Sequence, residues 1–139
     1  MPIQPGQQIR RTPAILNAVA ADIPANATTE VQVSVGGQDF EIQQVAARGT
    51  LGPFLFNFVP SDTDTKFATQ KVDAYSIFGL AGGATSDCVP LRIDGGAGSK
   101  QERPLRIKAA STITVELQNT HSAQQTIYIA FIGCKLSAV

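Results

Sequence analysis

The strongest constraint on the fold of this chain is a pair of alternating segments near its C-terminal end. Residues 112–118 alternate between polar and apolar side chains, a period of two that places one face in a core and the other in water. The polar run 119–123 supplies turn chemistry, and residues 126–132 return as a segment dense in β-branched and aromatic side chains. The sequence therefore predicts a long antiparallel β-hairpin from Ser111 to Leu136.

The returning segment of this hairpin is apolar on both of its faces. Ile127 and Ile129 fall on one side of the predicted strand, and Tyr128, Ala130 and Ile132 fall on the other. Each side then needs a cover, because a strand that is apolar on both faces is typical of a buried position. We expect it to lie in the centre of a sandwich or against a buried interface.

The rest of the chain repeats the same pattern of short apolar segments separated by Gly, Pro and Asn. No amphipathic helix stands out, so the sequence predicts an all-β fold, an antiparallel β-sandwich best described as a jelly roll. The segment 15–21 suits a short helix or a strand, and we favour a strand because of its β-branched residues. The expected core residues are Val31, Val33, Phe56, Ile113, Val115, Leu117, Ile129 and Phe131.

The length of 139 residues fits one domain that can bury a core without disulfide or metal support. Residues 1–12 contain two prolines, a glycine and three glutamines, a composition that forms no helix and buries little surface. We predict an extended N-terminal arm over 1–12 and a single β-sandwich domain over 13–139.

Two interpretations of the arm stay open. It is either a disordered tail, as termini commonly are, or a segment that lies on a neighbouring subunit. In the second case the contacts come from Ile3, Ile9, Arg10 and Arg11.

The charge balance argues against nucleic acid as a direct partner. Eleven basic and eleven acidic residues give a formal net charge of zero, so no global field attracts an anionic polymer. Only 16% of the residues are charged, and such a low-charge polar surface suits a protein that packs against other proteins.

The chain shows no sign of membrane insertion or export. No apolar run approaches the roughly 18 residues that a spanning helix needs, and Met1 to Pro5 are not followed by a signal-like apolar core. Cys88 and Cys134 are then expected to be buried reduced thiols, and the protein to be made in the cytoplasm.

Three stretches resemble catalytic or ligand-binding motifs, but the surrounding sequence argues against a functional site at each of them. The run Asp62 to Thr65 resembles a phosphate-transfer signature, but that chemistry needs a parallel strand in an α/β fold, and a calcium loop would need further acidic positions. The run Gly95 to Lys100 lacks the Gly-Lys-Ser/Thr order of a phosphate-binding loop. The only histidine, His121, stands alone in a predicted turn. We therefore predict no enzymatic activity, no catalytic residue, no metal and no cofactor.

The segments from Leu105 to Thr120 and from Ile127 to Leu136 resemble the head decoration, or cement, proteins of tailed bacteriophages. In that class the pattern closes a β-sandwich of jelly-roll type, which clamps neighbouring major capsid subunits on the outer shell. The resemblance implies a structural virion protein present in many copies on the capsid surface. The alternatives are a tail, neck or head-fibre component and, from another class, a carbohydrate-binding jelly roll. The second would display aromatic platforms, whereas this chain has no Trp and only Tyr75 and Tyr128.

The same resemblance implies the major capsid protein as a partner. Further copies of the chain are a second expected partner, because a symmetric oligomer that binds two capsomers at once benefits from effective concentration. We favour a homodimer over a homotrimer because closed two-fold pairing is the commonest symmetry. The expected self-contact lies at sheet edges or on the apolar side around Tyr128, Ala130 and Ile132. Arg10 and Arg11 are expected to pair with carboxylates of the capsid protein.

Overall fold

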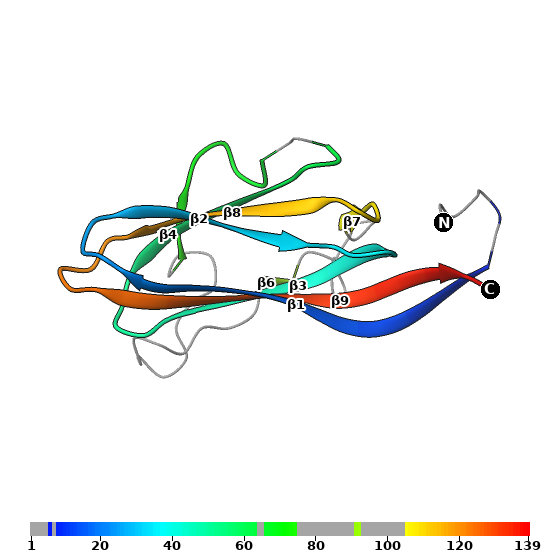
Figure 1. Cartoon of the computed structure of the whole chain (residues 1–139), viewed down its shortest axis with the longest axis horizontal. Helices are drawn as coiled ribbons and strands as arrows, with labels where there is room; N and C mark the ends of the chain where they lie inside the picture. Colours follow the sequence, from blue (N-terminus) through cyan, green and yellow to red (C-terminus); the bar gives the residue numbers. More distant parts are fainter. Residues whose placement is uncertain (1–5, 7, 64–65, 75–90, 93–104) are drawn as a thin grey trace.

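The computed structural model describes residues 6, 8–63, 66–74, 91–92 and 105–139 of the chain. All regular elements in these ranges are β-strands, and they form two antiparallel sheets packed face to face (Figure 1). The predicted all-β fold and β-sandwich are therefore confirmed.

Nine strands make up the described structure. Their bounds are β1 Ile9–Ile23, β2 Thr28–Ser34, β3 Asp39–Gly49, β4 Phe54–Pro60, β5 Val72–Asp73, β6 Leu91–Arg92, β7 Leu105–Ile107, β8 Thr112–Asn119 and β9 Gln125–Ala138. The two strands predicted between Ser111 and Leu136 are confirmed as β8 and β9, but the predicted hairpin is wrong. Strand β8 pairs with β2 and β4 in sheet B and β9 pairs with β1 and β3 in sheet A, because the turn between them crosses from one sheet to the other.

The strand order shows a nested arrangement. Sheet A has the order β1-β9-β3-β6, with β7 also paired to β3, and sheet B has the order β2-β8-β4-β5. The first strand thus pairs with the last, β2 pairs with β8, β3 pairs with β6 and β7, and β4 pairs with β5. Successive strands from β1 to β4 alternate between the two sheets, so the chain winds around a single core.

The core lies between the sheets and is rich in phenylalanine. The ring of Phe58 packs edge-on against Phe131 of the other sheet, with centroids 5.2 Å apart, and lies 5.7 Å from the ring of Phe56. Seven of the eight predicted core residues are buried, and the eighth, Val31, is partly buried against the same cluster. The period-two argument therefore assigned the inward faces correctly.

Strand β1 begins earlier than the sequence suggested. Its pairing with β9 runs from Ile9 opposite Ala138 to Ile23 opposite Gln125, and the amide of Val139 donates to the Gln8 carbonyl at 3.0 Å. Residues 9–12 of the predicted arm are thus strand, because the C-terminal end of β9 offers their backbone groups a hydrogen-bonding partner. Residues 1–5 and 7 lie outside the described residues. The strand favoured over 15–21 is confirmed.

A β-bulge in β3 sets the register of sheet A. Ile42 lies opposite Gly133 and Gln44 opposite Ile132, so Gln43 is the extra residue. The β3 backbone approaches so closely that a Cβ at Gly133 would overlap the Glu41 carbonyl oxygen. Only glycine fits at this position, and the bulge changes which residues of β3 face the core.

A buried amide pair joins the turns at one end of the sandwich. Asn119 donates from Nδ2 to the carbonyls of Ile23 and Ala123, both at 2.9 Å, and accepts a 2.7 Å hydrogen bond from Gln125 Nε2. Gln125 also donates to the Pro53 carbonyl at 3.0 Å. These bonds satisfy backbone groups that burial would otherwise leave unpaired, and they tie sheet A to sheet B.

Candidate functional site

The outward side chains of β1, β9 and β3 form a regular grid on sheet A. Because paired residues of antiparallel strands lie side by side, the register defines three rows across these strands. We call this set the outer grid: a first row of Ile15, Ile132 and Gln44, a middle row of Asn17, Ala130 and Ala46, and a third row of Val19, Tyr128 and Arg48.

The outer grid exposes large apolar side chains. Ile15 is 56% exposed, Val19 51% and Tyr128 41%, while Ala130 and Ile132 between them are partly buried. Single apolar residues on a surface are ordinary, but contiguous ones mark an interaction site. The middle row holds the shorter side chains Asn17, Ala130 and Ala46.

Arginine and tyrosine form a contact at the edge of the third row. The Arg48 guanidinium carbon lies 5.1 Å from the centroid of the Tyr128 ring, which is cation–π distance. Arg48 therefore holds the ring against the sheet and supplies hydrogen-bond donors at the border of an apolar surface.

On sheet B, the outward side of β2 and β8 has the opposite character. The outward residues of its two paired strands β2 and β8 are Thr28, Glu30, Gln32, Ser34, Thr112, Thr114, Glu116 and Gln118. Glu30 lies opposite Glu116 in the register, and Lys66 Nζ lies 3.4 Å from Glu116 Oε2. This face therefore suits solvent.

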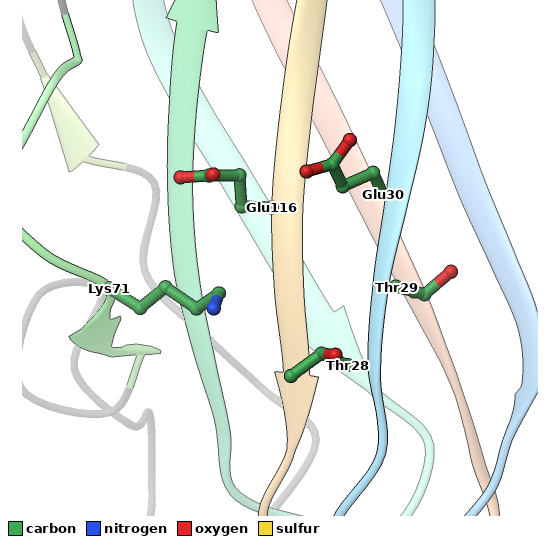
Figure 2. A pocket seen from close by; sticks show the side chains of 5 residues that line it. All are labelled: Thr28, Thr29, Glu30, Lys71 and Glu116. Carbon is green, nitrogen blue, oxygen red and sulfur yellow. The ribbon is translucent and has the colours of Figure 1, made fainter.

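A hollow of about 300 Å³ on this polar face is lined by Thr28, Thr29, Glu30, Lys71 and Glu116. Figure 2 shows the two carboxylates projecting from β2 and β8 and the Lys71 amine extending from the segment before β5. Charges of both signs therefore line this hollow. Nothing in this arrangement supplies a nucleophile with its base.

Two of the predicted interface residues lie together, as the sequence suggested. Tyr128 and Ile132 project from β9 into the outer grid, in the third and first rows. The sequence argument missed Ile15 and Val19, which complete these rows. The available signal was similar to that in β9: apart from Asn17, the segment 15–20 is also apolar on both faces.

The remaining predicted interface residues lie elsewhere. Ile3 is outside the described residues, while Ile9, Arg10 and Arg11 begin β1 at the end where β9 finishes (Figure 1). They are separated along β1 from the outer grid. The predicted interface residues therefore lie in two separate regions of sheet A.

Arg11 has a partner within the fold. Its Nε lies 3.4 Å from Oε1 of the buried Glu41, and Arg106 Nη2 lies 4.0 Å from Oε2. Gln43 Nε2 also donates to Glu41 Oε1 at 3.3 Å. A buried carboxylate needs such compensation, so Arg11 stabilises the β1–β9–β3 assembly before it can serve any outside partner.

The residues considered above as catalytic or metal-binding candidates make hydrogen bonds to backbone amides in turns and loops. Asp62 Oδ2 accepts a hydrogen bond from the Lys108 amide at 3.2 Å, and His121 Nδ1 accepts one from the Ala123 amide at 3.1 Å. The stretch from Gly95 to Lys100 lies outside the described residues.

The two cysteines were predicted to be reduced. Cys134 is a buried free thiol, and Gln43 Nε2 lies 3.8 Å from its sulfur. Cys88 lies outside the described residues.

Within the described ranges, no group of three or more His, Cys, Asp and Glu side chains is placed to hold a metal ion. Nor does that part of the chain contain a helix long and apolar enough to cross a membrane. No protein-family model, curated protein or solved structure matches this chain.

Proposed function

We propose that this protein is a structural component of a bacteriophage virion that binds the outer surface of the capsid and clamps neighbouring major capsid subunits. The observation that carries the proposal is the exposed apolar outer grid on sheet A, in contrast to the polar outward side chains of β2 and β8 on sheet B. Such asymmetry is expected of a protein that rests on other proteins through one side.

The nested strand pairing supports a jelly roll. The first strand pairs with the last, and inner strands pair in the same nested way within each of the two sheets. The wrapped path of a jelly roll would produce this pairing. Jelly rolls build many viral capsid proteins, so the fold is compatible with a virion role. Fold alone does not define function, and the outer grid remains the principal argument.

The segments that resemble decoration proteins support the same proposal. They correspond to β7 and β8 and to most of β9, and β9 is the middle strand of the outer grid. The resemblance therefore includes the strand that contributes Tyr128 and Ile132 to the exposed surface.

The free energy that each side chain of the outer grid can contribute is small, which is consistent with binding through many weak contacts. Covering a side chain such as Ile15 or Val19 contributes about 1 kcal/mol, because each is already half buried in the free protein. A protein present in many copies gains stability for the shell by adding such contacts across a junction.

Two measurements test the proposal. Mass spectrometry of purified virions should find the protein in the head fraction, and purified protein should co-sediment with undecorated heads built from the capsid protein of the same genome. Recovery in separated tails alone would assign it to the tail or neck. Absence from virions, together with no binding to heads, would contradict a virion role.

The N-terminal arm contributes separately. A deletion that tests it stops before Gln8, since the Gln8 carbonyl accepts a hydrogen bond from the Val139 amide and residues from Ile9 onward pair with β9. We expect the variant lacking residues 1–7 to keep the circular dichroism spectrum of the intact protein and to bind heads less tightly. Equal binding at every salt concentration would show that the arm makes no contact.

A further inference from the structure

We infer that the open edge of sheet A pairs with the same edge of a second copy of this chain, so that β1 of one copy runs antiparallel beside β1 of the other. Strand β1 ends sheet A, and among the described residues its only paired strand is β9. Pairing at this edge leaves the outer grid uncovered and sets the outer grids of both copies side by side on one face. The inference therefore does not compete with the surface proposed for the capsid.

One hydrogen bond identifies the backbone groups of β1 that point away from β9. The Val139 amide donates to the Gln8 carbonyl at 3.0 Å, and the register continues to Ala20 without a shift. Hydrogen-bonded pairs alternate with non-hydrogen-bonded pairs in an antiparallel ladder, so the even-numbered residues of β1 bond to β9. The odd-numbered residues direct their backbone groups to the open edge. Between Thr12 and Ala20 these are Pro13, which has no N–H, and Ile15, Asn17 and Val19.

Strand β1 is the least protected edge in the part of the chain that the structure describes. The edge strands β5, β6 and β7 are only two or three residues long, and β2 has seven residues and carries the charged Glu30. Strand β1 has 15 residues, and residues 12–21 contain no charged side chain. Proteins usually block an edge with charges, prolines or a short strand, since unpaired backbone groups otherwise accept a strand from another chain. The edge of β1 is therefore the place where a further strand can be added.

The charges at the two ends of β1 favour a second copy in the antiparallel direction. The strand begins with Arg10 and Arg11 and carries Asp22 near its end. Reversing one copy brings the acidic end of each β1 toward the basic end of the other. A parallel pair of β1 strands would instead bring like charges together.

The regular part of β1 is centred on Asn17. A two-fold axis at this residue places Ile15 opposite Val19 of the partner subunit, and each of these pairs exchanges two backbone hydrogen bonds. Pro13 and the irregular stretch after Ala20 then lie at the ends of the paired region, where a missing donor disturbs it least. At the axis the two Asn17 side chains lie next to each other, and their amides can hydrogen-bond.

The shortness of the paired region sets the strength of the dimer. Residues 15–19 cover about 13 Å along one strand, so the contact is well below the roughly 800 Å² per partner of a standard interface. The isolated dimer should therefore be weak, with a dissociation constant on the order of 100 μM. It should form efficiently where many copies are held close together on one surface.

The edge pairing has a direct spectroscopic test. Leu16 and Ala18 of the partner subunit would form a non-hydrogen-bonded pair with Cα atoms about 4.5 Å apart, whereas residues two apart in one strand are separated by roughly 6.6 Å. A sample mixing isotope-labelled and unlabelled protein, at about ten times the expected dissociation constant, should show an intermolecular nuclear Overhauser effect between the Hα atoms of these two residues. Intermolecular effects from another surface, or none at all, would overturn the proposed dimer.

Proline substitutions give a second test with a matched control. Asn17→Pro removes an N–H from the open edge of β1 and leaves the bonds to β9 intact, as Pro13 already does. Gln32→Pro does the same at the open edge of β2, because the Val35 amide donates to the Ser111 carbonyl and the odd-numbered residues of β2 therefore bond to β8.

Sedimentation equilibrium over a concentration series compares these variants. Asn17→Pro should weaken dimerisation at least tenfold, and Gln32→Pro should dimerise like the wild type. Asn17→Asp keeps the backbone donor and places two carboxylates at the axis, so it should also weaken dimerisation at least tenfold even if the proline variant fails to fold. Dimerisation of Asn17→Asp equal to that of the wild type would exclude the edge of β1 as the interface.

The outcomes separate this inference from the proposed function. A protein that remains monomeric at every concentration but binds heads contradicts the dimer and leaves the virion role intact. A protein that dimerises through the edge of β1 but binds no heads and is missing from virions contradicts the virion role alone.

Discussion

The outer faces of the two sheets differ although their inner faces share one core. Strands β8 and β9 each lie between two neighbours in their sheet, and each sends alternate side chains into the same apolar interior. Outward, β8 presents Thr, Thr, Glu and Gln, whereas β9 presents Tyr128, Ala130 and Ile132. Position within a sheet therefore does not explain the apolar outward side chains of β9.

This difference separates what the fold requires from what it does not. The polar face of sheet B shows that a central strand of this sandwich is stable with outward Thr and Glu, which favour a solvated antiparallel sheet. The outward apolar residues of sheet A expose hydrophobic area to water, which adds little to the stability of the free protein. They are best explained by a partner that covers them.

The largest expected effect comes from the bulge that aligns the outer grid. Gly133→Ala should lower the free energy of unfolding by about 3 kcal/mol or more, because the new Cβ would overlap the Glu41 carbonyl oxygen and push β3 away. Urea denaturation followed by circular dichroism measures the loss.

Gly37→Ala is the matched control for this substitution. No atom lies within 4 Å of a Cβ built there, so we expect a change within about 0.5 kcal/mol. Similar stability of the two variants would mean that the close approach at the bulge is not a real constraint.

The next effect concerns the amide pair that fixes the two sheets to each other. Asn119→Ala should destabilise the protein by about 3 kcal/mol, since several buried partners, including the Ile23 and Ala123 carbonyls, lose their hydrogen bonds. Thermal unfolding should show the change, whereas Gln118→Ala on the outer face of sheet B should unfold close to the wild-type temperature. An undisturbed Asn119→Ala variant would contradict the role of the network.

A smaller effect is expected for the ion pair between Arg11, near the start of β1, and Glu41. Arg11→Ala should cost about 1 kcal/mol, because Glu41 is buried but the guanidinium is half exposed and solvent screens the pair. Arg10→Ala, at an exposed neighbouring position, should cost less. Chemical denaturation of both variants compares them, and a larger loss for Arg10→Ala would reverse the assignment.

The smallest effect lies on the polar face and has the opposite sign. Glu30→Gln should stabilise the protein by about 0.3 kcal/mol by removing one of two carboxylates that face each other across β2 and β8. The gain should shrink as salt rises, because these charges are near the surface. A loss of stability at low salt would show that the Glu30 carboxylate has a favourable partner.

The sequence predicted the architecture better than the surface. Alternation identified the core residues of β4, β8 and β9 because each side chain of a strand has only two directions. The strand pairing, the bulge at Gln43 and the start of β1 at Ile9 depend on distant segments, so no local pattern could reveal them.

The sequence predicted only part of the candidate surface. The sequence singled out Tyr128 and Ile132, but their neighbours Ile15 and Val19 join them only through the pairing of the first strand with the last. Arg11, expected on a free arm, is instead held by Glu41, which lies 30 residues away in the sequence. Residues from distant strands become neighbours through the register, which local composition does not encode.

The most direct test of the central claim, that the protein binds through the outer grid and not through sheet B, compares one charge on each face. Val19→Asp and Gln32→Asp should both fold, since both positions are exposed. Each variant is mixed with undecorated heads, and the bound fraction is measured after sedimentation. We predict that Val19→Asp reduces the bound fraction at least tenfold while Gln32→Asp binds like the wild type. Equal binding of the two variants, or a loss confined to Gln32→Asp, would contradict the claim.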